Sequence, residues 1–332
     1  MSSRNRRTEE TLTVENILRG TSFGNTQSVG QMQVVPILDE SGDASDDHYA
    51  APNLNVRTSN YGTVDVRNED EERETIIPTG AGWVTKQHAQ DHAIPSAHVV
   101  KPKSTESIDT AMCIEESQSG LIQGATDFLI IPATLRVKAL SKRHDQNYSK
   151  LWSDIGKFNR SLDVSNGTGH LVRFLKQYER ELDEFVAEFE IVPNQIGAIV
   201  LIAGKIVGIE RAPNFPFWEK IWTPLIRVCY GSLAIQAHKL LGTTQPSTRS
   251  SIVMLEKSLD GLKAALDYAH MHSQQLVMNE FNKAKQLPLK QKVDSAMPSG
   301  ASLITIANQF LAGQIITREE RIPYASICAA GA

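Results

Sequence analysis

The stretch QIGAIVLIAGKIVGIE, residues 195–210, constrains the fold of this chain more than any other segment. Aliphatic residues and glycine fill almost all of it, with a single Gly204-Lys205 pair near the middle. A run of this kind can be a phosphate-binding loop, a membrane segment or a buried pair of strands. Each of these would indicate a different class of protein.

The phosphate-binding loop and the membrane segment both fit the sequence poorly. A phosphate loop needs the spacing GxxxxGK followed by Ser or Thr, whose hydroxyl binds magnesium. Gly197 and Gly204 are two residues too far apart for this spacing, and Ile206 follows Lys205. A membrane span needs an apolar run of ~18 residues or more, and Lys205 interrupts the run here.

The stretch therefore predicts a β-hairpin that turns at Ala203-Gly204 or at Gly204-Lys205. Glycine readily adopts the positive φ that tight hairpin turns require. Because apolar residues lie on both faces, we expect the hairpin at the centre of a sheet, with helices covering at least one side. Lys205 is expected at its exposed tip.

The order of patterns along the chain indicates an α+β fold. Alternating apolar and polar residues predict a strand-rich N-terminal half, and a further strand is expected over 302–317. Apolar residues at helical spacing predict amphipathic helices at 148–162, 171–189, 215–242 and 252–269. We expect the N-terminal strands and the central hairpin to pack against these long helices, and Pro224 to kink or divide the third of them.

The chain is expected to form one domain with two loose ends. Residues 1–24 are polar and predict a disordered N-terminal arm, and residues 321–332 predict a flexible tail. A single α+β domain is expected over 25–320, and a subdivision near 142–147 is the alternative. An acidic segment rich in small residues, 39–53, predicts a mobile loop.

Composition narrows the class of protein. Apolar residues make up 41% and charged residues 22%, which is typical of a globular protein. The net charge of -4 disfavours binding to nucleic acid. Three widely separated cysteines and no signal peptide indicate a reducing interior. We therefore expect a soluble, cytoplasmic protein that does not associate with membranes.

The richest polar segment is KQHAQDHAIPSAHVV, residues 86–100. His88 and His92 are four residues apart, which on a helix places both imidazoles on one face, as in HExxH zinc sites. Ala89 stands where the catalytic glutamate would be, and Asp91 is a further candidate ligand. One hypothesis is thus a metal-dependent hydrolase using His88, Asp91 and His92. The alternative is a polar loop or strand end with solvated histidines.

Cys113 and Glu115 belong to the segment CIEESQSG, which follows an expected strand. A thiol beside carboxylates has a raised pKa, so Cys113 is interpreted as a buried strand residue instead of a nucleophile. Paired acids such as Glu115 and Glu210 can perform acid–base chemistry. Nothing in the sequence brings these two residues together.

Three segments together resemble a known family. Residues 85–116 resemble a stretch in which a Lys-Gln pair precedes a polar spacer and a strand ending in Cys-apolar-Glu. Residues 151–162 resemble the Trp-containing helix that follows it, and the hairpin at 195–210 resembles a Gln-apolar-Gly hairpin leading into a long helix. This is the ARG-and-rhodanese-phosphatase-superfamily-associated protein family, ARPP. The resemblance spans about residues 31 to 317.

The resemblance implies a stand-alone intracellular binding domain near ADP-ribose or phosphorylated nucleotide metabolism. The matching positions are Lys86, Gln87, Cys113, Glu115, Trp152, Gln195 and Gly197. We therefore take Lys86, Gln87, Glu115 and Gln195 as candidate residues for a small phosphorylated ligand. The catalytic residues, the cofactor and whether the chain is an enzyme stay open.

Two departures from the family pattern favour an alternative function. His88-Ala89 stands where the family has a basic residue, and Ser117-Gln118-Ser119 stands where it tends to have Gly-Arg-Trp. A divergent member, including one encoded by a phage or a mobile element, could be a non-catalytic assembly protein. It would bind a protein partner or form a homo-oligomer, and the apolar helix with Trp218 and Trp222 is its candidate surface.

Overall fold

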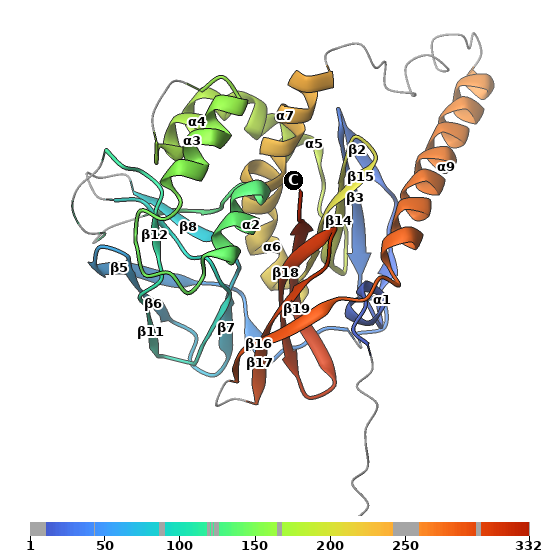
Figure 1. Ribbon diagram of the computed structural model, residues 1–332. Helices are drawn as coiled ribbons and strands as arrows, with labels where there is room; N and C mark the ends of the chain where they lie inside the picture. The colour runs from blue at the N-terminus through green and yellow to red at the C-terminus, as the bar shows by residue number, and fades with distance from the viewer. Residues whose placement is uncertain are drawn as a thin grey trace, which may run out of the picture.

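The computed structural model describes residues 11–331, apart from 43, 86–89, 118–119, 121, 123–125, 165–167, 242–258 and 297–299. Within these residues, the centre of the fold is a nine-stranded sheet in which every pairing is antiparallel (Figure 1). Its strands, in spatial order, are β1 (Ser22–Phe23), β3 (Met32–Leu38), β14 (Gln195–Ile202), β15 (Lys205–Arg211), β19 (Arg321–Ala329), β18 (Leu311–Arg318), β17 (Ala301–Ala307) and β16 (Lys290–Ala296), with β2 (Gln27–Val29) beside β3.

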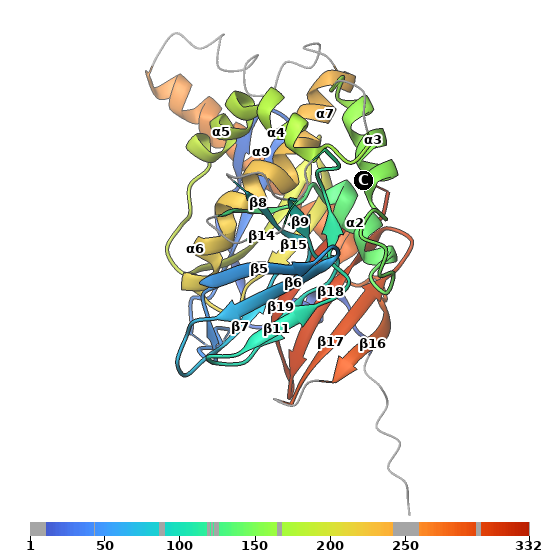
Figure 2. The same ribbon diagram turned by 90° about the vertical axis from the view of Figure 1, so that its left-hand side faces the viewer.

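Three smaller sheets lie in front of the large sheet in Figure 2, beneath a group of helices. Their strands are β4 (Tyr49–Ala50), β7 (Glu74–Ile77) and β10 (His98–Val100); β5 (Leu54–Asn60), β6 (Thr63–Asn68) and β11 (Thr105–Ile108); and β8 (Ala81–Thr85), β9 (His92–Ala93), β12 (Met112–Cys113) and β13 (Thr126–Ile130). The described helices are α1 (Val14–Ile17), α2 (Ala133–Ser141), α3 (Trp152–Ser161), α4 (Leu171–Gln177), α5 (Glu179–Glu188), α6 (Phe215–Pro224), the π-helical turn η1 (Leu225–Tyr230), α7 (Gly231–Leu241) and α9 (Leu259–Ala284). The predicted strand-rich α+β fold is confirmed.

The predicted central hairpin is confirmed as β14 and β15. Ile202 pairs with Lys205, so the turn consists of Ala203 and Gly204, which both have positive φ, at 49° and 75°. Two consecutive positive φ values define the type I′ turn that suits a two-residue hairpin loop. Lys205 is exposed at the tip, where its Nζ lies 3.3 Å from Glu280 Oε1.

Side chains along β14 alternate between two hydrophobic cores, which explains why the strand is apolar on both faces. Ala198 and Val200 face the core beneath α6, η1 and α7. Ile199 and Leu201 face the core beneath α1 and α9. Every residue of β14 is consequently buried.

Two positions of the hairpin require glycine, because η1 and the neighbouring strand approach the backbone closely there. A Cβ on Gly208 would lie 2.0 Å from the hydroxyl oxygen of Tyr230, which belongs to η1. On the neighbouring strand, a Cβ on Gly197 would lie 2.2 Å from the carbonyl oxygen of Glu210. Both distances are far inside van der Waals contact, so any other residue would push these elements apart.

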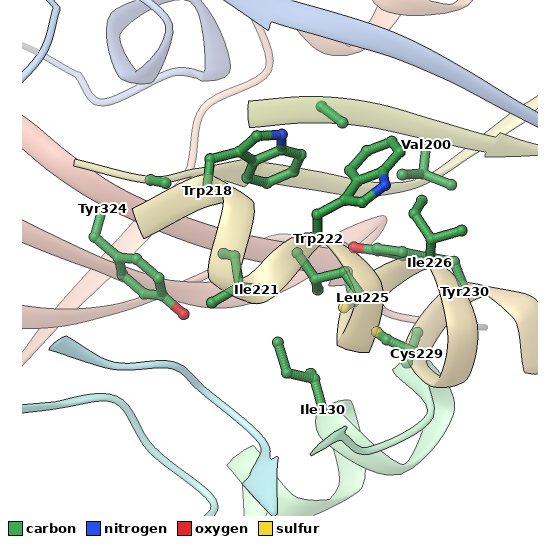
Figure 3. Close-up of a cluster of buried hydrophobic side chains, with 14 of the residues drawn as sticks. Ile130, Val200, Trp218, Ile221, Trp222, Leu225, Ile226, Cys229, Tyr230 and Tyr324 are labelled. Atoms are coloured by element: carbon green, nitrogen blue, oxygen red, sulfur yellow. The ribbon is translucent and has the colours of Figure 1, made fainter. Parts of the chain in front are cut away.

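Pro224 divides the long helix predicted over 215–242, as expected. It ends α6, and η1 follows before α7 begins. Proline lacks the N–H that an α-helix needs at an interior position, and a π-helical turn absorbs the break. Trp218 and Trp222 are only 1% and 3% exposed, and they pack into the core drawn in Figure 3. They are therefore core residues instead of a docking surface.

The C-terminal segment differs from the prediction in two places. Residues 302–317 form the hairpin of β17 and β18, because Asn308 Oδ1 accepts the N–H groups of Phe310 and Leu311 in a tight turn. Residues 321–329 form β19 between β15 and β18, so a flexible tail over 321–332 is wrong for this part. Small and polar residues in β19 conceal the strand pattern.

Ordered structure also begins within the arm predicted over residues 1–24. Thr13 caps α1 through a capping box with Asn16, and Val14 and Ile17 of that helix are fully buried. Residues 1–10 lie outside the described part of the chain. Across the described helices, none has the length and apolar character needed to span a membrane.

A buried ion pair connects α2 to the large sheet. Arg136 Nη1 lies 2.7 Å from Glu210 Oε1, and both side chains are 3% exposed. Tyr230 donates its hydroxyl to the same oxygen at 2.5 Å, and Arg136 also contacts Ser326 Oγ and Cys229 Sγ. Glu210 is thus a structural group here, with its carboxylate occupied by Arg136 and Tyr230.

We expect Glu210→Gln to lower the free energy of unfolding by ~3–5 kcal/mol, because it leaves the buried Arg136 guanidinium without a carboxylate. Urea denaturation measures this difference. Glu184→Gln is the matched control, since Glu184 pairs with Arg180 on an exposed helix face, and it should change stability little. Equal midpoints for the two variants would contradict the role assigned to the ion pair.

Candidate functional site

The sheet β12-β9-β8-β13 brings a group of polar side chains together in the interior. Cys113 of β12 pairs with His92 of β9, and Glu115 forms a β-bridge with His170. Asp91 directly precedes β9. The five residues are at most 8% exposed, and we call them the Glu115 cluster: Asp91, His92, Cys113, Glu115 and His170.

Glu115 has one occupied and one unoccupied carboxylate oxygen. Oε1 lies 2.6 Å from His170 Nδ1 and accepts the hydroxyl of Ser117 at 2.7 Å. Oε2 is buried and has no hydrogen-bond partner among the described residues. Buried carboxylate oxygens are normally paired, so Oε2 is a position at which a ligand donor could bind.

Asp91 of this cluster is fully buried. Its Oδ1 accepts the backbone N–H of Thr85 at 2.6 Å. Burial, the largest cause, and the charge of Glu115 raise the pKa of Asp91 to about 7, although Thr85 and Lys176 oppose the shift. A carboxyl group with this pKa can exchange its proton near neutral pH, as acid–base chemistry requires.

Two side chains of α3 donate hydrogen bonds to backbone carbonyl groups of the Glu115 cluster. Trp152 Nε1 donates to the carbonyl of Cys113 at 3.1 Å, and Asn159 Nδ2 donates to the carbonyl of His170 at 2.9 Å. Gly169 has a φ of 65°, and a Cβ there would lie 2.6 Å from the Trp152 ring. The tryptophan singled out by the family pattern therefore positions the strand that carries Glu115.

Cys113 is a buried strand residue, as the sequence predicted. Its Sγ donates to the carbonyl of Glu115 at 3.3 Å, and burial raises the pKa of the thiol to about 11. The thiolate is the nucleophilic form of cysteine, and burial disfavours that form at Cys113.

The predicted site residues divide into three groups. Glu115, Asp91 and His92 come together in the Glu115 cluster. Lys86, Gln87 and His88 lie outside the described residues, although they are close in sequence to Asp91. Gln195 lies at the start of β14, where its amide accepts the N–H of Val192 and donates to the carbonyl of Gly197.

The metal site predicted from His88, Asp91 and His92 stays a prediction. His92 Nδ1 lies 2.8 Å from the carbonyl oxygen of Gln90, and its buried Nε2 has no hydrogen-bond partner among the described residues. Burial lowers the pKa of His92, which favours the neutral ring that metals bind. In the described part of the chain, no three His, Cys, Asp or Glu residues are grouped to hold a metal ion.

His170 is the cluster residue that the sequence did not predict. It lies 55 residues after Glu115, just before α4, and no short motif connects the two. The one local sign is Gly169, because the left-handed backbone of a glycine commonly marks a tight turn beside a functional position.

The raised pKa of Asp91 predicts a pH-dependent stability. The unfolded carboxyl has a pKa near 3.8 and the folded one about 7, so the folded state binds this proton more tightly. The contribution of Asp91 to stability is therefore lost as pH rises from about 4 to about 7, by at most ~1.4 kcal/mol per pH unit. Urea denaturation of the wild-type protein and of Asp91→Asn across this range measures it. A constant difference between the two proteins would contradict the assigned pKa.

Comparison with known proteins gives one match that covers most of the chain. The model of the ARG and Rhodanese-Phosphatase-superfamily-associated Protein domain, ARPP-1, matches residues 20–293, which include the Glu115 cluster and the central hairpin. Neither the curated proteins nor the solved structures yield a match. The chain belongs to the ARPP-1 family.

Proposed function

We propose that this chain is a binding domain that engages an ADP-ribose-like or other phosphorylated nucleotide ligand at the Glu115 cluster. The observation that carries the proposal is the buried Oε2 of Glu115, which has no hydrogen-bond partner among the described residues. His170 and Ser117 fix the other oxygen, so the free one has a defined direction. A preorganised acceptor of this kind binds a donor with little loss of entropy.

The chemistry of the cluster suits the ribose part of such a ligand. Carboxylates accept hydrogen bonds from ribose hydroxyls in dinucleotide-binding proteins. Glu115 and Asp91 provide two carboxyl groups, and Lys176 is close enough for its charge to lower the pKa of Asp91. Lys86, near Asp91 in sequence, would provide a positive charge for the phosphates.

We expect ADP-ribose to raise the melting temperature of the protein at near-millimolar concentration, because a ligand that binds only the folded state stabilises it. NAD, AMP and ATP are tested in parallel by thermal shift, and calorimetry then gives the affinity. Glu115→Gln removes the charge and half of the acceptor capacity, so it should weaken binding about tenfold or more. Glu184→Gln, on the exposed face of α5, is the matched control and should bind like the wild-type protein.

A shift for none of these ligands would contradict the proposal. Equal affinities for Glu115→Gln and the wild-type protein would place binding elsewhere. Asp91→Asn and His170→Asn then separate the roles of the remaining polar side chains.

A second proposal, self-assembly, has one observation in its favour. Three large apolar side chains on α9 are exposed: Tyr268 at 56%, Met271 at 61% and Leu276 at 49%. Tyr268 and Met271 are three residues apart and share one side of the helix, and a contiguous apolar patch typically marks an interaction surface. A second copy of the chain is the partner that we infer.

Light scattering tests the assembly. We expect a dimer at micromolar concentration that dissociates in Met271→Lys, because a buried lysine would remain unpaired at the interface. Lys283→Met serves as a control, since it alters the same helix at an exposed position that pairs with Glu280. A monomer at all concentrations would rule this proposal out.

A further inference from the structure

A cavity of about 360 Å³ lies away from the Glu115 cluster, where α1 meets the turn between β18 and β19. Its lining includes three arginines from separate segments: Arg19 just after α1, Arg211 at the end of β15, and Arg321 at the start of β19. Guanidinium groups that converge on one cavity are the usual means by which proteins bind phosphate.

Arg211 lies buried beneath the cavity and is bonded to neutral groups. Its Nη1 donates to the carbonyl of Ile17 at 2.6 Å and more weakly to that of Arg19, and its Nη2 donates to that of Ala44 at 3.1 Å. Its Nε has no hydrogen-bond partner among the described residues. These three carbonyl groups are uncharged, so they hold the guanidinium in place without cancelling its charge.

The environment of Arg211 is poor in negative charge. Burial, the largest cause, and the nearby charge of Arg321 together lower the pKa of Arg211 to about 10. Asp39 is the acidic group that opposes this shift, but its two oxygens accept the N–H groups of Ala44 and Ser45. A bound anion would therefore stabilise the buried positive charge of Arg211.

The β18–β19 turn adds two guanidinium groups to the same region. Arg318 and Arg321 face each other across the turn, and Arg318 Nη1 is buried without a hydrogen-bond partner in the described chain. Arg321 is exposed, and its Nη1 lies a long 3.4 Å from the carbonyl oxygen of Ser45. Its side chain can therefore turn toward a ligand at little cost.

Three acidic residues also line the cavity. Glu319 and Glu320 are exposed on the turn, where water screens their charge. Asp46 is half-buried. Burial raises the pKa of its carboxyl group, and the positive charges of Arg318 and Arg321 oppose that shift. Asp46 is thus the carboxylate with which an incoming anion would compete.

We propose that this cavity binds phosphate, either as the free ion or as the phosphate group of a small molecule, with Arg19 and Arg321 donating hydrogen bonds and Arg211 adding positive charge from below. Arg19 and Arg321 both lie outside residues 20–293, the part matched by the family model. The site is independent of the ligand proposed for the Glu115 cluster.

Isothermal titration calorimetry with inorganic phosphate and with ribose 5-phosphate, at constant ionic strength set by sodium chloride, tests the proposal. We expect saturable binding of phosphate in the millimolar range or tighter. Arg321→Gln should weaken it about tenfold, because each charged hydrogen bond contributes on that scale. Asp46→Asn should strengthen it, because the amide keeps the acceptor for the His48 N–H and removes the competing charge.

Two controls separate this site from other effects. Arg180→Gln removes an exposed guanidinium on α5 and should bind phosphate like the wild-type protein. Glu115→Gln should also leave phosphate binding unchanged, which distinguishes this cavity from the Glu115 cluster. Tighter binding of ribose 5-phosphate would identify a phosphorylated small molecule, and equal affinities would identify the free ion.

Absence of saturable heat at phosphate concentrations up to roughly 10 mM would overturn the proposal. Equal affinity for Arg321→Gln and the wild-type protein would overturn it as well. Arg321 is exposed, so its substitution should leave the fold intact, and circular dichroism verifies this. Arg19→Gln provides a second exposed substitution at the same cavity.

Discussion

The buried pair of Arg136 and Glu210 is the interaction on which the arrangement of the layers depends. Removing two charges from water is costly, and the cost is offset only when good geometry and further hydrogen bonds satisfy both groups. Tyr230, Ser326 and Cys229 provide those contacts. Elements from four parts of the chain, α2, β15, η1 and β19, must therefore meet at one point.

The position of α2 also fixes the position of the Glu115 cluster, because a short segment of the chain connects them. The helix α2 follows β13 after two residues, and β13 belongs to the same sheet as β9 and β12. A second link runs through Gln314 of β18, whose Oε1 accepts hydrogen bonds from Thr79 Oγ1 and from the N–H of Ala97. Tyr324 of β19 accepts the N–H of Thr79. Large and small sheets are thus connected by polar contacts across an apolar interior, which fixes their relative orientation more sharply than packing alone.

Local sequence patterns predicted those helices and strands in which buried apolar residues recur at a regular spacing. The central hairpin and the divided helix at Pro224 were predicted because a glycine turn, a proline and apolar periodicity are all visible within a short window. The strand β19 was not, because Ala325, Ser326 and Cys328 are buried only by virtue of the strands on either side. The same limit applies to the site. Glu115 was a candidate from the sequence, whereas its partner His170 depends on a β-bridge that no local pattern encodes.

The pairing of β15 with β19 has a consequence for how the chain folds. The two strands are neighbours in the sheet, yet α6, η1, α7, α9 and the strands β16 to β18 lie between them in sequence. The edge of β15 thus lacks its partner strand until β19 has left the ribosome, although the apolar hairpin has already been synthesised. Contacts between such distant segments form slowly, and an unpaired apolar edge is prone to aggregation in the interval. The yield of native protein in a cell would accordingly depend on how well that edge is protected while translation continues.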